Sequence, residues 1–503
     1  MEHRIKSVEQ SMAETHEERH SLKRNLGVFD LAVMGVAVAV GAGIFSVGAQ
    51  AAAFHAGPAV IISFLIAAIV CGLAIMCYAE FASSIPVAGS AYTFTYSTMG
   101  EILAWVIGWD LILETFMAAS VISKYWGIYL ADAVKLFDLN LSTTIPIGSL
   151  TLDWGPVLIV AVFTTLLALG TRLSTRVNAV FTIIKVGIVV FVIVVGLSFI
   201  QGSNFSPFVP EAQAVTSDTA VWQQSFFSWI TGAAPTEYGV FGILSGAALV
   251  FFAFIGFDVV ATSAEETKDP KRTVPRGILL GLSIVTVLYV LVAITVTGMV
   301  SYAQLASVED PSLSTAFELV GATWAAKVIT VGILIGLTTV VMVLLLGMTR
   351  VVFAMSRDGL LPRALSVTSG KRGTPARLQI VVGVLVAVVA GFTNVGVLSD
   401  MINIGTLSAF ILVSIGVPIL RRTRPDLERP FRVPLSPWLP WVSALACTWL
   451  MLNLSNETWV RFVVWLAIGF IIYFSYSRRH SLVGQTLSAT KEAARTESET
   501  TIP

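Results

Sequence analysis

Charged side chains are scarce in this chain of 503 residues: only 12% of the residues are Asp, Glu, Lys or Arg, whereas 55% are hydrophobic. Soluble domains typically carry about 25% charged residues. A water-soluble protein of this length could not cover so much apolar surface, so the composition excludes that class. The mean hydropathy of +0.83 agrees. We therefore predict a polytopic membrane protein.

Several other features are missing. The 31 basic residues balance the 31 acidic ones, and no basic face emerges, which argues against a nucleic-acid partner. The chain has only three cysteines and five histidines, with no CxxC and no His–Cys spacing typical of a metal site. It contains neither HExxH nor GxSxG, so no hydrolytic constellation is evident. We expect no enzyme activity, no metal and no cofactor.

Long apolar runs are what the sequence does contain. A run of about 20 apolar residues is long enough to cross a bilayer as a helix. Twelve such spans are expected, near Val28–Phe54, Ala59–Phe81, Ile102–Leu130, Pro156–Leu173, Val177–Ile200, Val240–Thr262, Gly277–Val300, Val328–Ala354, Leu378–Phe392, Val397–Ile419, Trp438–Leu454 and Val460–Tyr476. The segment between the fifth and sixth spans, 201–239, carries no basic residue, and we expect short interfacial helices in it rather than a separate domain.

The basic residues indicate the orientation. Loops on the cytoplasmic side of a membrane are enriched in Lys and Arg. If the amino terminus is cytoplasmic, almost every basic residue lies on that side, and an even number of spans returns the carboxyl terminus to it. The exceptions are Lys124, Lys135, Lys185, Lys327 and Arg461. Tryptophans commonly mark the two interfaces, and we expect most of this set to do so: Trp105, Trp109, Trp126, Trp154 and Trp438.

Two of the spans are interrupted by glycine. The first contains "VAVAVGAGIFSVGAQAA", and the sixth contains "LVFFAFIGFDVVATSAEE", where Gly256 and Asp258 interrupt the apolar run. Glycine in a helix interior costs about 1 kcal/mol relative to alanine. Paired interruptions in two halves of a chain point to a transporter's central site, where unwound backbone can bind the substrate. The alternative is that these glycines only permit close helix packing, as Gly277/Gly281 and Gly332/Gly336 would.

Three motifs carry a resemblance to a known family. "GAGIF" in the first span, "FFAFIGFDVVATSAEETKDPKRTVPRGI" and "GMTRVVFAMSRDGLLP" resemble the amino acid–polyamine–organocation superfamily, and within it the cationic amino acid transporters and their bacterial relatives. The resemblance implies an all-α fold of the LeuT type, with 12 transmembrane helices in a 5+5 inverted repeat plus two peripheral helices. The divisions implied are a cytoplasmic segment 1–26, a first repeat 27–200, an extracellular loop 201–239, a second repeat 240–422, spans eleven and twelve in 423–477, and a cytoplasmic tail 478–503.

The resemblance also implies where a substrate would bind. In the first span the backbone would receive the carboxylate and the amine, and in the sixth span backbone carbonyls would bind the amine. Many relatives have Thr in this motif where this chain has Ala42, so the backbone must act without that hydroxyl. The Phe252 ring would act as a gate. The implied residues are Ala39, Val40, Gly41, Ala42, Gly43, Ile44, Phe252, Ala253, Ile255, Gly256, Leu337 and Thr338.

Ionisable residues inside the predicted spans indicate how transport could be coupled to protons. Lys185 has seven uncharged residues before it and a longer uncharged run after it. A lysine at a bilayer centre costs roughly 2.5–3.5 kcal/mol, and burial disfavours its charged form. It could simply tie the fifth span to its neighbours; alternatively it loses and regains a proton during transport. The resemblance places it where sodium-coupled relatives hold a cation, with Glu114 and Asp258 as the acids that would tune it. We expect Asp110, Glu114 and Lys124 of the third span to face the bundle interior and pair.

Together these features predict a multi-pass plasma-membrane transporter that imports L-amino acids by proton symport. The apolar pocket of Phe252, Ile255 and Leu337 favours small neutral substrates. The alternative is an exchanger of arginine with ornithine or a polyamine, which would prefer acidic pocket residues. A channel should show a polar pore stripe, and a receptor that only binds amino acid stays open. The expected partners are an L-amino acid, protons and the lipid bilayer; the oligomeric state stays open, a monomer included.

Overall fold

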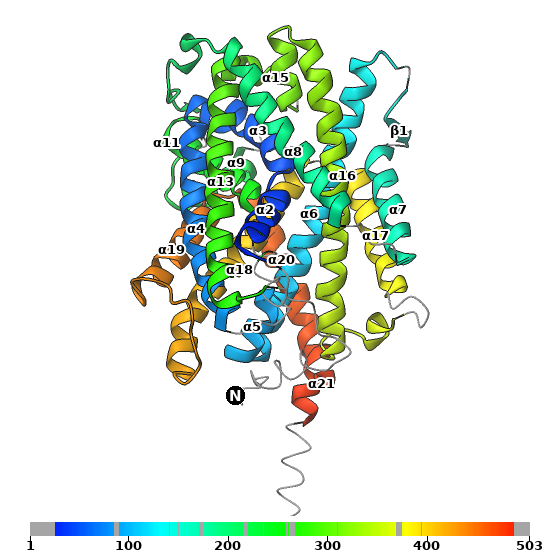
Figure 1. The fold of residues 1–503 in the computed structure, drawn as a ribbon, viewed down its shortest axis with the longest axis vertical. Coiled ribbons are helices and arrows are strands. Elements are labelled where there is room, and N and C mark those ends of the chain that lie inside the picture. The colour runs from blue at the N-terminus through cyan, green and yellow to red at the C-terminus, as the bar shows by residue number, and fades with distance from the viewer. Residues whose placement is uncertain are drawn as a thin grey trace, which may run out of the picture.

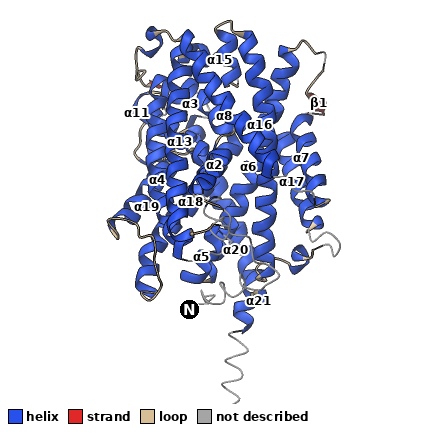
Figure 2. Cartoon of the chain, viewed as in Figure 1, coloured by secondary structure: helices blue, strands red, loops and turns tan. Residues whose placement is uncertain are grey.

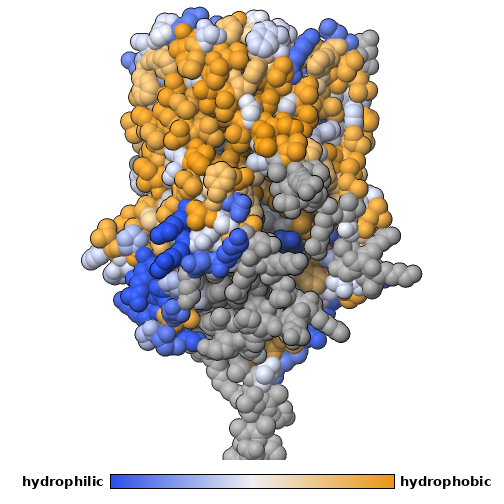
Figure 3. Space-filling model, viewed as in Figure 1, coloured by the Kyte–Doolittle hydropathy of each residue, from blue (hydrophilic) through white to orange (hydrophobic). Residues whose placement is uncertain are grey.

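The computed structural model is a bundle of helices (Figures 1 and 2). It describes residues 26–84, 90–139, 141–148, 150–170, 175–214, 220–234, 236–257, 260, 267–308, 310–368, 375–393 and 395–486. Figure 3 shows a broad hydrophobic band around the bundle, with hydrophilic side chains concentrated at its lower end. This surface is the one that a bilayer-embedded protein requires.

Seven helical runs among the described residues are long and apolar enough to cross a membrane: Gly43–Ser84, Glu101–Leu136, Val180–Phe199, Arg272–Met299, Thr323–Arg357, Leu398–Thr423 and Asn456–His480. Shorter apolar helices span Val28–Ala39, Trp154–Ala168, Gly239–Phe254, Ala376–Phe392 and Trp438–Leu452. Each run overlaps a predicted span, and the first long run covers the second half of the first span together with the whole of the second. The predicted helical, polytopic architecture is therefore confirmed.

The individual elements have the following bounds. The longer helices are α2 (Val28–Ala39), α4 (Val60–Ser84), α5 (Ser90–Thr98), α6 (Glu101–Leu136), α7 (Trp154–Ala168), α8 (Thr175–Gly196), α11 (Gly239–Val250), α13 (Pro270–Met299), α16 (Thr323–Arg357), α17 (Ala376–Phe392), α18 (Val395–Thr423), α19 (Trp438–Leu452) and α20 (Asn456–Ile472). The short α-helices are α3 (Gly48–Ala51), α9 (Ala220–Gln223), α10 (Phe226–Ile230), α14 (Tyr302–Leu305), α15 (Leu313–Leu319) and α21 (Arg478–His480). Short π- and 3₁₀-helical turns are η1 (Gly43–Val47), η2 (Ala52–Ala56), η3 (Gly57–Ala59), η4 (Leu197–Phe199), η5 (Gly202–Phe205), η6 (Phe251–Phe254), η8 (Arg363–Ser366) and η9 (Tyr473–Ser477).

Strands occur only in connecting loops of the part of the chain that is described. A hairpin pairs β1 (Thr144–Ile147) with β2 (Leu150–Asp153), and a second pair joins β3 (Gln213–Ala214) to β4 (Thr236–Glu237). The sequence analysis predicted neither pair, because both are too short to show an alternating pattern. The expectation of short helices within 201–239 is met by η5, α9 and α10.

Three long helices form the interior of the bundle. Helix α6 packs against both α16 and α18, and these are its most extensive contacts. Of the 18 most apolar consecutive residues in each helix, 72% are buried in α18 and 67% in α6. The corresponding share in the run that contains α20 is only 22%. The interior is therefore built around α6, α16 and α18, and α20 lies at the periphery.

Small residues allow the helices around this interior to pack closely. A Cβ atom on Gly277 or Gly281 would press on the backbone of α2, at 3.1 Å from the Val28 carbonyl and 3.0 Å from the Ala32 carbonyl. The sequence-based interpretation of this pair as a close-packing motif is confirmed. It positions α13 directly against α2, beside the first interrupted span.

Two of the tryptophans expected at the interfaces are instead buried. The indole of Trp105 donates a hydrogen bond to the Gly469 carbonyl at 3.0 Å, and that of Trp109 donates to the Trp465 carbonyl at 2.9 Å. The Trp109 and Trp465 rings stack with centroids 4.4 Å apart. The prediction was wrong for this pair because the sequence does not show that α20 packs against their face of α6. Trp438 is 76% exposed, as expected of an interfacial residue.

Candidate functional site: two broken helices

The first predicted span is broken near its middle. Helix α2 ends at Ala39, Val40 has an extended backbone (ψ 92°), and the helix resumes with Ala42 and the π-helical turn η1. A helix that ends leaves its last carbonyl groups without intrahelical partners, and one that begins leaves its first N–H groups without them. The break therefore presents carbonyls on one side and N–H groups on the other.

The sixth predicted span is broken in the same manner. Helix α11 ends at Val250 and continues as the 3₁₀ turn η6, after which Ile255 is extended (ψ 144°). Gly256 follows with φ +109°, a conformation that residues with a Cβ rarely adopt. Helical structure resumes at Phe257. Gly256 therefore permits this break, as its position in the motif suggested.

The two breaks lie against each other. Turn η1 contacts turn η6. A Cβ atom on Gly43 would overlap the Cα of Ala253, with the Ala253 Cβ at 2.6 Å and its nitrogen at 3.0 Å. A Cβ on Gly256 would overlap the side chain of Val38. Glycine at position 43 thus lets the two backbones meet directly, and glycine at position 256 leaves room for the Val38 side chain.

Gly41 differs from Gly43. The nearest atoms to a Cβ built there are the Ile122 Cδ1 at 3.9 Å and the Ala39 carbonyl oxygen at 4.0 Å. These are ordinary van der Waals distances, so the space beside Gly41 is not closed by another backbone. Ile122, on α6, is a residue of this region that the sequence analysis did not single out.

Tyr289 of α13 is a second residue that the sequence analysis missed, and it joins the two breaks. Its hydroxyl lies 2.6 Å from the Ala39 carbonyl oxygen and 2.9 Å from that of Ala253. The side chain is fully buried. One hydroxyl proton is thus shared between a freed carbonyl of each broken helix. The sequence feature that could have identified Tyr289 is its position as a lone phenol within the apolar run "SIVTVLYVLVAITV" of the seventh span.

Lys185 of α8 reaches the first break. Its Nζ donates a hydrogen bond of 2.5 Å to the carbonyl oxygen of Ala37, in the last turn of α2. Its side-chain stem packs on α16, where a Cβ on Gly336 would meet the lysine Cγ and Cδ. The side chain is 3% exposed. The lysine therefore connects α8, α16 and the end of α2.

The two predicted residues of the eighth span lie on α16. Leu337 is fully buried in α16. The Thr338 hydroxyl lies 3.1 Å from the Trp126 indole nitrogen of α6, and Trp126 also donates to the Leu334 carbonyl at 3.2 Å. Trp126 is therefore hydrogen-bonded to α16. Thr338 thus contacts α6, and both residues follow directly after Gly336, against which the Lys185 side chain of α8 packs.

The acidic residues of α6 are buried. Glu114 is 5% exposed and lies beside α18. A Cβ atom built on Gly405 of α18 would lie 3.9 Å from the Glu114 Cβ. Asp110 accepts a hydrogen bond from the Ser408 hydroxyl at 2.6 Å. Lys124 forms an ion pair with Asp153. The expectation that these side chains pair within the protein thus holds for Asp110 and Lys124.

Two further points delimit the site. Asp258, predicted to act in coupling, lies outside the described residues. Among the described residues, no group of three or more His, Cys, Asp or Glu side chains is placed to hold a metal ion.

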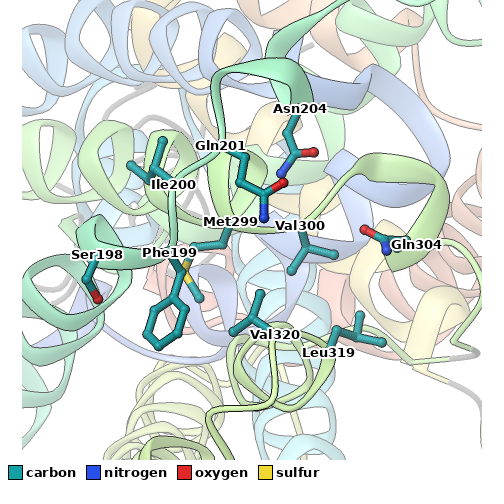
Figure 4. Close-up of a pocket in the computed structure, with 10 residues that line it drawn as sticks. All are labelled: Ser198, Phe199, Ile200, Gln201, Asn204, Met299, Val300, Gln304, Leu319 and Val320. Atoms are coloured by element: carbon teal, nitrogen blue, oxygen red, sulfur yellow. The ribbon is translucent and has the colours of Figure 1, made fainter.

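A separate cavity of about 350 Å³ lies at one end of the bundle, beyond α8 and α13. Figure 4 shows its lining, in which Gln201, Asn204 and Gln304 supply amide groups and none of the labelled side chains is charged. None of the predicted substrate-binding residues lines it. The broken helices, rather than this cavity, hold the residues that the sequence predicted.

Comparison with known proteins bears on this arrangement. Residues 26–476 match the family model described as "Amino acid permease". The chain is 42% identical to the branched-chain amino acid permease BcaP of Bacillus subtilis over 489 residues, which cover 96% of this chain and 99% of the relative. It is 39% identical to the methylthioribose transporter of the same organism over 470 residues (92% and 96%). It is 36% identical to the vacuolar cationic amino acid transporter 4 of Arabidopsis thaliana over 425 residues (83% and 66%).

The match extends through both broken helices and all the long apolar helices. It confirms the resemblance indicated by the three sequence motifs. The chain belongs to the amino acid permease family of the amino acid–polyamine–organocation superfamily, and is a multi-pass membrane protein of a family of transport proteins.

Proposed function

We propose that this protein is a secondary transporter that imports an L-α-amino acid by alternating access. The observation that carries the proposal is the meeting of two broken helices, with Gly43 of one against Ala253 of the other. Backbone groups at membrane depth require partners, because lipid supplies none. A zwitterion provides both kinds: its carboxylate accepts from N–H groups, and its ammonium donates to carbonyls.

Each end of the substrate has a proposed place. The carboxylate binds at the start of the second half-helix, along the backbone of Gly41, Ala42, Gly43 and Ile44, where helix N-termini favour anions. The ammonium binds carbonyls at the end of α2, around Ala39 and Val40, and those of Phe252, Ala253 and Ile255 in the second break. The break at Gly256 allows these carbonyls to point toward the first helix.

The side chain of the substrate is proposed to be small and neutral. Ile122, Phe252 and Ile255 are apolar and lie at the two breaks. Leu337 and Thr338 are proposed to line the far side of the pocket, with Phe252 as its gate. An apolar lining leaves a second charged group on a substrate without a partner, which is costly. The 42% identity to a protein named a branched-chain amino acid permease supports a neutral substrate.

Transport is proposed to be driven by protons, with Lys185 as the switch. The hydrogen bond from its Nζ to Ala37 supports this role, because that bond joins α8 to the half-helix that must move. An ammonium donates three hydrogen bonds, whereas a neutral amine donates weakly. Protonation would hold α2 against α8 in the substrate-binding state, and deprotonation would release it. Glu114 and Asp258 are the proposed relay acids.

The proposed topology has 12 membrane-crossing helices, with both termini in the cytoplasm. The proposed location is the plasma membrane. Spans one to five (27–200) and six to ten (240–422) would form inverted repeats of the LeuT type, and 423–477 would add two peripheral helices. The corresponding positions of the two breaks, in the first helix of each set of five, support this division.

Binding on purified protein tests the central claim. Alanine should raise the thermal midpoint, whereas alanine methyl ester and N-acetyl-alanine should raise it far less, because each has lost one of the two charged ends. A competition panel of all twenty amino acids against one labelled substrate then tests selectivity, and small neutral residues should win. Equal binding of alanine and its two blocked forms would contradict recognition of both ends by the backbone.

Reconstituted protein tests the coupling. Under an inward proton gradient without sodium it should accumulate amino acid, and Lys185→Ala should lose this accumulation while it retains wild-type folding. Lys327→Ala removes a lysine that lies outside the site, at the start of α16, and is the matched control. Undiminished gradient-driven uptake by Lys185→Ala, or strict dependence on sodium, would rule out the proposed switch.

The second candidate is an exchanger of cationic amino acids or of an amino acid with a polyamine. The relatives named cationic amino acid transporters favour it. Arginine or lysine winning the competition panel by a wide margin would support this reading. The relative named a methylthioribose transporter raises a third possibility. Because methylthioribose has neither a carboxylate nor an amine, binding of that compound in preference to every amino acid would identify it.

A further inference from the structure

The loop between α18 and α19 combines positive charge with exposed apolar side chains. Residues 421–432 contain five arginines but only two acidic residues, Asp426 and Glu428. The hairpin drawn in orange at the lower left of Figure 1 lies where Figure 3 shows a hydrophilic cluster directly beneath the hydrophobic band. The loop is thus at the edge of the surface that the bilayer covers.

A buried carboxylate fixes this loop to the bundle. Glu80, near the end of α4, is 1% exposed. Its Oε1 and Oε2 accept hydrogen bonds from Nε and Nη2 of Arg421 at 2.8 and 2.6 Å, and its Oε2 also accepts from the Val433 N–H at 2.7 Å. Arg429 lies 3.9 Å away and donates to the carbonyls of Leu427 and Leu420 at 2.8 and 3.0 Å. Arg421 and Arg429 therefore have structural partners, which hold the loop in one conformation.

The remaining groups face outward. Arg422 and Arg432 are exposed, and neither forms a hydrogen bond or an ion pair with any residue in the described part of the chain. Leu435 is 80% exposed and has a positive φ of 50°, which is unfavourable for a residue with a Cβ. Trp438, three residues further on, is 76% exposed. Within the described part of the chain, the loop thus presents two cations without a partner, and Arg432 precedes the two large apolar side chains by three and six residues.

Helix α19 indicates the depth of the loop. From Trp438 it continues into the hydrophobic band with Val442 and Leu445, which are 51% and 68% exposed. Trp438 therefore stands at the lower border of that band, at the level where tryptophan is enriched in membrane proteins. At this level the arginines would lie among lipid headgroups, and a charged arginine near an anionic membrane surface contributes about 1 kcal/mol of attraction.

We propose that the loop 422–438 is a binding site for the headgroup of an anionic phospholipid, with Arg422 and Arg432 on the phosphate and Leu435 and Trp438 inserted beside its acyl chains. Charge complementarity selects an anion, and the apolar pair adjoining the arginines selects a lipid over a soluble anion. The site goes beyond the proposed transport activity and does not depend on it. It requires only that this end of the bundle lie at a membrane surface.

Native mass spectrometry of the purified full-length protein in a neutral detergent tests the site. Dioleoyl phosphatidylglycerol and dioleoyl phosphatidylcholine are titrated separately, and bound lipids are counted. The wild-type protein should bind the anionic lipid more tightly. The double variant Arg422→Gln/Arg432→Gln should weaken phosphatidylglycerol binding about thirty-fold, from about 1 kcal/mol for each arginine, and leave phosphatidylcholine binding unchanged.

The matched control removes two other exposed arginines from the same end of the bundle, Arg363 in η8 and Arg377 in the first turn of α17, in the double variant Arg363→Gln/Arg377→Gln. It should retain wild-type binding, and both double variants should retain the wild-type thermal midpoint. Trp438→Ala should weaken binding of both lipids by a similar factor. Equal affinity of the wild-type protein for the two lipids, or an equal loss in the control, would overturn the proposal. So would displacement of the lipid by glycerol 3-phosphate at a similar concentration.

Discussion

The hydroxyl of Tyr289 is the group whose removal best tests how the two broken helices are held together. The substitution Tyr289→Phe keeps the ring and its packing and removes only the hydroxyl. That hydroxyl serves the carbonyls of Ala39 and Ala253, at 2.6 and 2.9 Å. Its loss leaves both carbonyls with one partner fewer in a region from which lipid and bulk water are excluded.

The magnitude follows from these contacts. A buried carbonyl that loses its hydrogen-bond partner costs about 1–3 kcal/mol. Because the two carbonyls share a single proton, we expect the loss to fall within this range rather than at twice its value. A change of about 1–3 kcal/mol corresponds to roughly a 5–150-fold shift in a conformational equilibrium. The conformation in which the breaks are joined should become less populated by that factor.

Thermal unfolding and amino acid uptake, measured on the same preparation, give the readouts. Tyr289→Phe should unfold at a lower temperature and transport more slowly. The matched control is Tyr238→Phe, which removes another buried tyrosine hydroxyl that donates to a backbone carbonyl, that of Ala53. The control should lose stability but keep its transport rate per folded molecule. Equal loss of transport in the two variants, or wild-type transport by Tyr289→Phe, would refute the reasoning.

Four further substitutions test packing at the breaks and elsewhere in the bundle. Gly43→Ala should abolish transport and lower expression, because its Cβ would overlap Ala253, whereas Gly41→Ala should fold normally; size-exclusion profiles and uptake distinguish the two. Glu80→Gln should destabilise the protein by about 1.5–3 kcal/mol in chemical unfolding, because it removes the charge of a buried carboxylate that accepts hydrogen bonds from the partly exposed Arg421; a loss below about 1 kcal/mol would contradict this. Trp109→Phe should lose about 0.5–1.5 kcal/mol of unfolding free energy, because its indole hydrogen bond to the Trp465 carbonyl is removed; wild-type chemical unfolding of this variant would contradict the assignment.

The sequence predicted the positions of both breaks because glycine carries a local signal. Gly256 has the positive φ that its place in the motif suggested, and Gly43 makes the close approach to Ala253. Lys185 could also be found from the sequence, since a lone charge in an apolar run requires a partner inside the protein. What the sequence could not give was that partner, the Ala37 carbonyl, because it depends on how α8 packs against α2.

The misses share one physical origin. Trp105 and Trp109 have the composition of interfacial residues, and only the docking of α20 shows that they are buried. Tyr289 was overlooked because a phenol is compatible with an apolar span, and its function emerges only where two unrelated backbones meet. Contacts between segments far apart in the chain leave no periodic pattern in the sequence. Local features were therefore predictable, and pairings between helices were not.

The hydrogen bonds already present at the breaks make the two ends of a substrate unequal. The carbonyl of Ala253 accepts from Tyr289, and that of Phe252 accepts from the Ile255 N–H at 3.2 Å. A carbonyl oxygen has two lone pairs, so an ammonium must share oxygens that are in use. The N–H groups of Ala42, Gly43 and Ile44 begin a helix and have no intrahelical partner by geometry, whereas the Phe45 N–H already donates to the Gly41 carbonyl at 3.3 Å.

The carboxylate should therefore contribute more to binding than the ammonium. Blocking the carboxylate, in alanine methyl ester, leaves the N–H groups at the start of the second half-helix without their anion. Blocking the amine, in N-acetyl-alanine, leaves carbonyls that Tyr289 and Ile255 still satisfy. We expect the methyl ester to bind more weakly than the N-acetyl compound in the thermal-shift assay, and we expect Tyr289→Phe to bring the two closer together. The opposite order of affinities would mean that the carbonyls, and not the N–H groups, dominate recognition.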